Sequence, residues 1–132
     1  MKKMFTLILL FLPIILYAPS MKYLNIPLRS EIKPFERLSW AVTIVESSGN
    51  NNALNEKEMA FGAFQIRQCL LSDFNRLSGK DYKLPEMYEY EKAKEVFIFF
   101  ACMYMDLEII SKKWNGSGEQ TEVYWQKIKV LL

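Results

Sequence analysis

Residues 46–65 read ESSGNNNALNEKEMAFGAFQ, and the rest of the chain is organised around this stretch. It opens with Glu46 at the end of a helix-like segment and continues as a loop rich in Asn, Ser and Gly. It then returns through Gly62, a residue type that marks a bend or a close approach of two backbones, and ends at Gln65. We predict a loop or small irregular hairpin over residues 50–64, with one carboxyl group at its edge.

Apolar residues at three- and four-residue intervals predict a helix on each side of this loop. The first helix begins at Pro34, which suits a first helical turn, and stops at residues 48–50. Its apolar face consists of Phe35, Leu38, Val42 and Val45, supported by Ala41 and Ile44. The second helix, closed by Ser78 and Gly79, carries Ile66, Leu70, Phe74 and Leu77. Glu46 therefore lies just past the last buried position of the first helix, between core and loop.

A third helix, over residues 88–114, is predicted to be the longest. Apolar positions extend nearly all round it, which is typical of a helix in the centre of a core. Its main face consists of Ala93, Phe97, Phe100, Tyr104, Leu107 and Ile110. Asn115 and Gly116 break this helix, and Thr121 begins a last one that carries Tyr124, Ile128 and Leu131 on one face. The pattern predicts a mainly α domain of about four helices around a long, apolar central helix.

The N-terminal segment has the pattern of a secretory signal peptide. It begins with Lys2 and Lys3, continues as a short apolar run and ends with small residues up to Ser20. We expect cleavage there and export to the periplasm or the extracellular space. The alternative is an anchor formed by an uncleaved N-terminal segment, although the run is short for a bilayer span. The predicted organisation is a signal peptide (1–20), a lead-in (21–33) and one domain (34–132).

The composition excludes several classes of function. The 132 residues include no histidine, which excludes Ser-His, Cys-His and His-metal sites. The net charge of +2 falls to zero without the two lysines of the signal peptide, which argues against nucleic-acid binding. Cys69 and Cys102 lack the spacing of a metal or redox motif. We predict two buried free thiols and leave a disulfide between them open.

Glu46 is the candidate catalytic residue. Sugar hydroxyl and N-acetyl groups need neutral hydrogen-bonding partners, which the amide-rich loop provides, and glycosidic cleavage needs a protonated carboxyl group. A free Glu is ionised at neutral pH, so the site must raise its pKa by burial, and Phe61 and Phe64 could provide apolar surroundings. The alternative is a plain polar residue at a helix end, where the helix macrodipole disfavours an acid.

Three separated motifs carry a resemblance to a known family. They are Glu46-Ser47-Ser48-Gly49-Asn50, Gly62-Ala63-Phe64-Gln65-Ile66 and Trp114-Asn115-Gly116, with Ala53 and Ala60 between the first two and Tyr124-Trp125 after the last. Their order and spacing resemble the soluble lytic transglycosylase (SLT-type) domain of the lysozyme-like superfamily, whose pattern runs E-S-x-G-N, G-L-M-Q-I and A-x-Y-N-x-G. The resemblance covers residues 35–132 and implies a lysozyme-like α+β fold with minimal β structure and a groove for the substrate.

The resemblance also assigns roles by position. Glu46 becomes the single catalytic acid/base. The implied substrate-binding residues are Ser48, Asn55, Phe64, Gln65, Tyr104, Trp114 and Asn115. The chain departs from the family pattern where Asn55 replaces a Ser, Phe64 and Arg67 replace Met residues, and Trp114 replaces a Tyr. Arg67 could meet a lactyl or stem-peptide carboxylate, or be a surface residue without a role.

The implied activity is that of a lytic transglycosylase. Such a lyase cleaves the β-1,4 bond between N-acetylmuramic acid and N-acetylglucosamine in peptidoglycan and leaves a 1,6-anhydro end. The alternatives are a hydrolytic lysozyme (muramidase), with Glu56 or Glu58 as a second acid, and a non-catalytic peptidoglycan-binding protein. We interpret both of those residues as solvated loop charges.

The expected partner is the glycan strand of the cell wall, bound by a monomeric chain without cofactor, metal or nucleic acid. Association with cell-envelope secretion or conjugation machinery stays open. So do wall remodelling, attack on competitors, and the choice between chain-end and internal cleavage.

Overall fold

The computed structural model describes residues 33–132. The predicted signal peptide and residues 21–32 of the predicted lead-in lie outside the described residues. The elements, in chain order, are α2 (Lys33–Ser47), β1 (Leu54–Asn55), β2 (Ala60–Phe61), α3 (Gln68–Ser78), the 3-10 helix η2 (Leu84–Tyr88), α4 (Tyr90–Tyr104), α5 (Leu107–Asn115) and α6 (Gln120–Lys129). This part of the chain is mainly α, as predicted. None of its helices is both long and apolar enough to cross a membrane.

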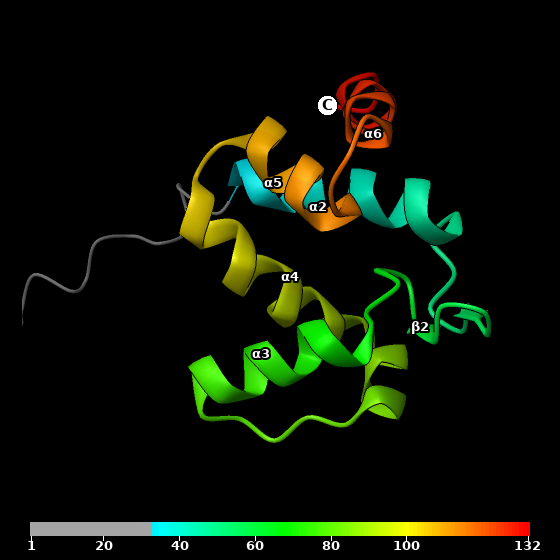
Figure 1. Ribbon diagram of the computed structural model, residues 1–132, viewed down its shortest axis with the longest axis vertical. Helices are drawn as coiled ribbons and strands as arrows, with labels where there is room; N and C mark the ends of the chain where they lie inside the picture. The colour runs from blue at the N-terminus through cyan, green and yellow to red at the C-terminus, as the bar shows by residue number, and fades with distance from the viewer. Residues whose placement is uncertain (1–32) are drawn as a thin grey trace, which may run out of the picture.

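Helix α4 runs through the middle of the domain (Figure 1). It packs against α3 and η2 on one side and against α2 and α5 on the other. Helix α6 lies against both α2 and α5, and the β1–β2 hairpin lies beyond the end of α2. Segments far apart in the sequence, α2 and the α5–α6 pair, are therefore side by side.

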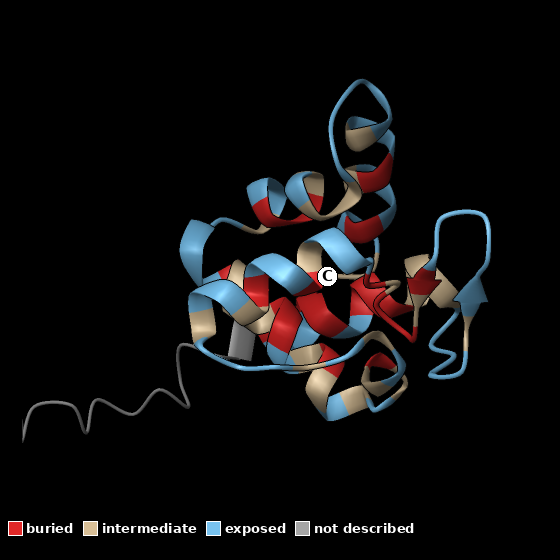
Figure 2. Cartoon of the chain, turned by 60° about the horizontal axis from the view of Figure 1, so that its bottom comes forward, coloured by how far each residue is buried: buried red, intermediate tan, exposed pale blue. Residues whose placement is uncertain are grey.

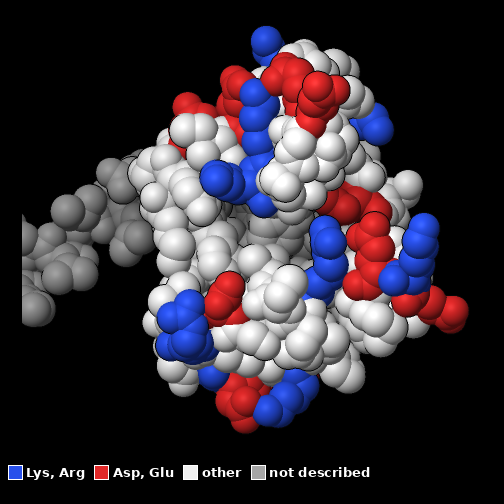
Figure 3. Space-filling model, viewed as in Figure 1, with Lys and Arg blue, Asp and Glu red and all other residues white. Residues whose placement is uncertain are grey.

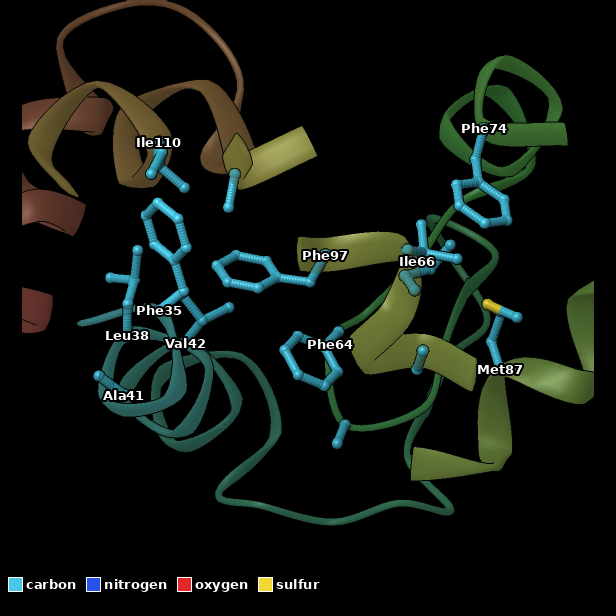
Figure 4. Close-up of a cluster of buried hydrophobic side chains, with 14 of the residues drawn as sticks. Phe35, Leu38, Ala41, Val42, Phe64, Ile66, Phe74, Met87, Phe97 and Ile110 are labelled. Carbon is cyan, nitrogen blue, oxygen red and sulfur yellow. The ribbon is translucent and has the colours of Figure 1, made fainter. Parts of the chain in front are cut away.

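The core lies between these helices. Figure 2 shows buried residues on the inward faces of the helices and in the segment that follows the hairpin. Residues 54–59 of the hairpin are exposed, whereas Ala60 is buried. Phe64 and Phe97 point toward one another in the close-up of Figure 4, and their rings stack with centroids 5.4 Å apart. Trp114 packs edge-on against both rings, at 6.4 and 4.9 Å. These aromatic contacts join the segment after the hairpin to α4 and α5.

The hairpin confirms the prediction for residues 50–64. Leu54 pairs with Phe61 and Asn55 with Ala60 in an antiparallel register. Gly62 follows with a φ of 75°, and a Cβ there would lie 1.9 Å from the carbonyl oxygen of Met87. Only glycine allows this approach to η2, because any side chain would overlap that backbone oxygen.

The prediction of one long central helix over residues 88–114 is wrong. α4 ends at Tyr104, and the next residue, Met105, has a left-handed φ of 57°. α5 starts at Leu107, after Asp106. The Asp106 side chain accepts a hydrogen bond of 2.8 Å from the backbone N–H of Ile109, which caps the new helix. The apolar pattern suggested continuity, but Asp106 provides a local start signal that outweighs it.

Two predictions of buried positions are also wrong. The face of α3 that packs on the domain centres on Leu71 and Phe74, and Leu77 lies at the edge of that stripe, 49% exposed. Cys69 and Cys102 are exposed and unpaired, because each lies on the side of its helix opposite the buried face. The prediction of free thiols agrees with the structure, while the prediction of their burial does not.

Candidate active site

The candidate site begins at the C-terminal end of α2. Glu46 is the last residue but one of this helix and is half-buried. The hydroxyl of the next residue, Ser47, lies 3.1 Å from the carbonyl oxygen of Thr43 and 2.9 Å from that of Ala63. The second contact joins the helix end to the segment that returns from the hairpin. The position of the Glu46 backbone relative to Gln65 is thereby set by a hydrogen bond and not by the loop alone.

Helix α6 provides the direct partner of the carboxyl group. The Tyr124 hydroxyl donates a hydrogen bond of 2.8 Å to Oε1 of Glu46 across 78 residues of sequence. Tyr124 is only 6% exposed. Burial and the adjacent carboxyl group raise the pKa of its phenol far above the ordinary value, so the hydroxyl keeps its proton and remains a donor.

The pKa of the Glu46 carboxyl is raised above its ordinary value of 4.5. Burial is the largest cause, because it penalises the charged form. The hydrogen bond from Tyr124 and the charge of Arg67 lower the pKa, and the charge of Glu58 raises it further. The net direction favours the neutral acid, which is the form that can donate a proton.

A polar cavity of about 470 Å³ lies beside Glu46. Its lining combines carboxylates, amides, one guanidinium and one indole: Glu46, Asn55, Glu58, Gln65, Arg67, Trp114, Asn115 and Gln120. These residues come from the end of α2, the hairpin, the segment before α3, the end of α5 and the start of α6. The volume is in the range of pockets that hold small organic ligands.

Gln65 has a strained backbone in the wall of this cavity. Its φ of 53° is left-handed, which is uncommon for a residue with a side chain and is enriched at functional sites. Its side-chain Nε2 donates a hydrogen bond of 2.9 Å to the carbonyl oxygen of Gly62. This bond fixes the amide and leaves its oxygen as an acceptor for a ligand.

Trp114 and Asn115 line the cavity from the end of α5. The indole Nε1 of Trp114 donates a hydrogen bond of 3.2 Å to the carbonyl oxygen of Phe64, which ties α5 to the segment before Gln65. The side-chain oxygen Oδ1 of Asn115 is buried and, among residues 33–132, has no hydrogen-bond partner. A buried acceptor without a partner is costly, so a ligand donor at this point would satisfy it.

The structure brings together five of the eight residues that the sequence assigned to the site: Glu46, Asn55, Gln65, Trp114 and Asn115. The remaining three lie elsewhere. Phe64 is fully buried in the core, so it supports the cavity wall without lining the cavity. Ser48 is exposed beyond the end of α2. Tyr104 is exposed at the end of α4 and lines a separate cavity of about 230 Å³ that also touches Trp114.

Four further residues belong to this site. No sequence pattern indicates Gln120, whereas Glu58 and Arg67 are open alternatives in the sequence and Tyr124 follows the last motif. Glu58 and Arg67 line the cavity and face each other, with Nη1 of Arg67 3.7 Å from Oε2 of Glu58. Gln120 lines it from the start of α6. The sequence places Tyr124 on an apolar helix face and after the last motif, without indicating its contact with Glu46. Helical spacing identifies a buried position but does not reveal which polar group its hydroxyl meets.

Neither Phe61 nor Phe64, the apolar neighbours suggested for Glu46, lines the cavity. Phe61 is half-buried and packs against Tyr88, with ring centroids 5.5 Å apart, and it does not line the cavity. Helix α2 packs against α5 and α6, and this packing brings Tyr124 to the Glu46 carboxyl group. Comparisons of the chain with models of protein families, with curated proteins and with solved structures find no significant match.

Proposed function

We propose that this protein is a peptidoglycan lytic transglycosylase in which Glu46 is the catalytic acid and base. The observation that carries the proposal is the Glu46 carboxyl group, whose pKa is raised by burial, in the wall of a cavity that Gln65 and Asn115 also line. The order of the sequence motifs supports it, because residues from all three motifs meet at this cavity. A lysozyme-like fold and a groove that continues the cavity along a glycan strand are part of the proposal.

The first step needs a proton on the carboxyl group. Neutral Glu46 transfers its proton to the oxygen between N-acetylmuramic acid and N-acetylglucosamine, and the bond from this oxygen to C1 of the muramyl ring breaks. Positive charge then develops on that ring. The raised pKa of Glu46 increases the fraction of molecules that hold the proton at neutral pH.

The second step returns the proton to the same residue. The Glu46 carboxylate removes a proton from the 6-hydroxyl of the muramyl ring, and this oxygen attacks C1 to close a 1,6-anhydro ring. The acid is regenerated without water and without a second catalytic carboxylate. The Tyr124 hydroxyl, 2.8 Å from Oε1, holds the carboxyl group in one orientation and stabilises its ionised form between the two steps.

The remaining walls of the cavity suit a sugar. The amides of Asn55, Gln65 and Asn115 provide neutral donors and acceptors for hydroxyl and N-acetyl groups. The buried oxygen of Asn115 would accept a hydrogen bond from one of them. Trp114 offers an aromatic surface for a sugar ring, while its N–H is already bound to Phe64.

One observation favours a second candidate, a hydrolytic lysozyme. Glu58 lines the same cavity as Glu46, so this chain has a second carboxylate where water or a cationic sugar ring could bind. Hydrolysis would leave reducing ends on the glycan, whereas the transglycosylase reaction leaves 1,6-anhydromuramyl ends. The products therefore distinguish the two reactions without reference to the structure.

The decisive experiment is a digest of purified peptidoglycan followed by mass spectrometry of the soluble fragments. We expect 1,6-anhydromuramyl ends from the native protein and no fragments from Glu46→Gln. The matched control is Glu91→Gln, which changes an exposed carboxylate in the first turn of α4 and should leave the products unchanged. Reducing ends would assign the protein to the hydrolytic class. Retention on insoluble peptidoglycan without any fragments would support a non-catalytic binding protein instead.

The proposal includes export of the chain to the compartment that holds its substrate. Residues 1–20 are proposed to act as a signal peptide, and the mature protein should begin near Met21. N-terminal sequencing of the secreted protein tests this. An intact Met1 on a membrane-bound protein would favour the anchored alternative.

A further inference from the structure

Arg67 is the only Lys or Arg among the eight residues that line the Glu46 cavity. It directly precedes α3 and has an extended backbone, with φ −102° and ψ 159°. Its side chain is 47% exposed, so it is open to solvent as well as to the cavity. Its charge lies close enough to Glu46 to lower the pKa of that carboxyl group. A guanidinium group therefore lies next to the proposed reaction centre.

The guanidinium group is only loosely held by the protein. Its nearest carboxylate oxygen belongs to Glu58 at 3.7 Å, which is beyond hydrogen-bonding distance. Both side chains are about half exposed, and ion pairs of this kind contribute little to stability. Within residues 33–132, the Arg67 side chain makes no hydrogen bond, and its one ion-pair contact is with Glu58. Its five N–H donors thus remain available to a ligand.

The chemistry of these donors favours one class of ligand group. A planar guanidinium binds a carboxylate through two parallel hydrogen bonds, whereas the amides of the same cavity can hydrogen-bond uncharged sugar groups. Basic and acidic side chains are interspersed over the face shown in Figure 3. Attraction of an anion to Arg67 comes from local contact, because the other charged residues that line the cavity, Glu46 and Glu58, are acidic.

We propose that Arg67 is a specificity-determining residue that binds a carboxylate of the glycan and makes the site select anionic over neutral sugar chains. This inference rests on the proposed function, because it names the substrate class of the same cavity. Glu58 forms a weak ion pair with the guanidinium in the free protein, and the carboxylate of the ligand takes its place. That carboxylate belongs either to the lactyl group of a muramyl residue without a peptide or to an acid of the stem peptide.

The test measures binding, so that it does not depend on cleavage. Glu46→Gln serves as the background, and isothermal titration measures its Kd for muramyl oligosaccharides before and after their carboxylates are converted to methylamides. Adding Arg67→Gln should weaken binding of the anionic form about tenfold, as expected for a charge-assisted contact, and leave binding of the methylamide form unchanged. Arg67→Lys should recover only part of the loss, because an ammonium group lacks the planar fork.

The control is Arg76→Gln, which removes an exposed arginine of α3 that pairs with Asp73 and lines neither of the two cavities described above. It should leave the Kd unchanged. Glu58→Gln should strengthen binding of the anionic form, because the ligand no longer competes with a protein carboxylate. Equal affinity for the anionic and methylamide forms, or no effect of Arg67→Gln on the anionic form, would refute the inference.

Two further experiments identify which part of the glycan provides the carboxylate, and distinguish failure of the Arg67 proposal from failure of the proposed function. Glycan stripped of its peptides carries free lactyl carboxylates, while peptide-bearing glycan carries only the peptide acids. The form whose binding responds to Arg67→Gln identifies the source. Native protein that cleaves anionic and methylamide glycan with the same KM would leave the proposed function intact and exclude the role of Arg67. If binding of the anionic form depends on Arg67 but the native protein releases no fragments, the role of Arg67 stands and the proposed cleavage is excluded.

Discussion

Replacing Glu46 by Gln is expected to make the folded protein more stable at neutral pH while it abolishes the proposed activity. The amide occupies almost the same space and can accept the hydrogen bond that Tyr124 donates. It carries no charge that burial would penalise. Burial raises the pKa of the native carboxyl group, so its ionised form costs free energy in the folded state. The substitution removes that cost.

The size of the effect follows from opposing contributions. Each unit by which a folded-state pKa exceeds the unfolded-state value corresponds to about 1.4 kcal/mol at a pH above both values. The Tyr124 hydrogen bond and the charge of Arg67 offset part of the cost of burial. We expect a net gain of about 1 kcal/mol, typical of substitutions at functional sites. For a domain of this size, such a gain raises Tm by about 4–8 °C.

The stability that Glu46→Gln gains over the native protein should increase with pH. Because the folded-state pKa of Glu46 is raised, the stability that this residue contributes is fully present below its ordinary pKa of 4.5. It is lost as the pH rises through the folded-state value. The difference in Tm between Glu46→Gln and the native protein should therefore be near zero in acid and increase toward neutrality.

Thermal unfolding followed by circular dichroism, at a series of pH values from 4 to 8, measures this difference. Glu91→Gln is the control, and its effect should stay below about 0.5 kcal/mol at every pH because its carboxylate is exposed. A Glu46→Gln variant that is no more stable than the native protein at neutral pH would refute the reasoning. So would a gain that does not vary with pH. Either result would mean that the Glu46 carboxyl group is well solvated in the folded protein.

Three other substitutions test the structure around this site. Tyr124→Phe removes the hydrogen bond that lowers the pKa of Glu46, so the alkaline limb of the pH profile of cleavage should move to higher pH. Urea unfolding should show that the free energy of unfolding falls by about 1–2 kcal/mol. Gly62→Ala places a Cβ against the carbonyl oxygen of Met87 and should lower the free energy of unfolding in the same assay by about 2 kcal/mol or more. A loss below about 0.5 kcal/mol would contradict the close approach of the two backbones. Asp106→Ala removes the cap of α5 and should cost about 1 kcal/mol, and an unchanged midpoint would argue against the break between α4 and α5.

The break at residues 105 and 106 illustrates why apolar periodicity predicts helices better than it predicts their ends. Apolar residues continue through Met103, Tyr104 and Met105, so the pattern alone extends the helix. These three side chains are exposed in the folded protein, and the Asp106 cap determines the start of α5. Periodicity reports where side chains can be buried, whereas a helix boundary depends on where backbone groups find partners.

The sequence by itself determined the mainly α class, the glycine that the hairpin requires and the residue types needed for an acid in an amide-rich site. Helical spacing, backbone sterics and side-chain chemistry are local properties, so they can be derived from neighbouring residues. Only the tertiary structure decided that Tyr124 meets Glu46 and that Arg67 and Glu58 share their cavity, while Phe64 and Tyr104 do not line it. These outcomes depend on how α2, α5 and α6 pack, and packing joins residues that no local pattern relates.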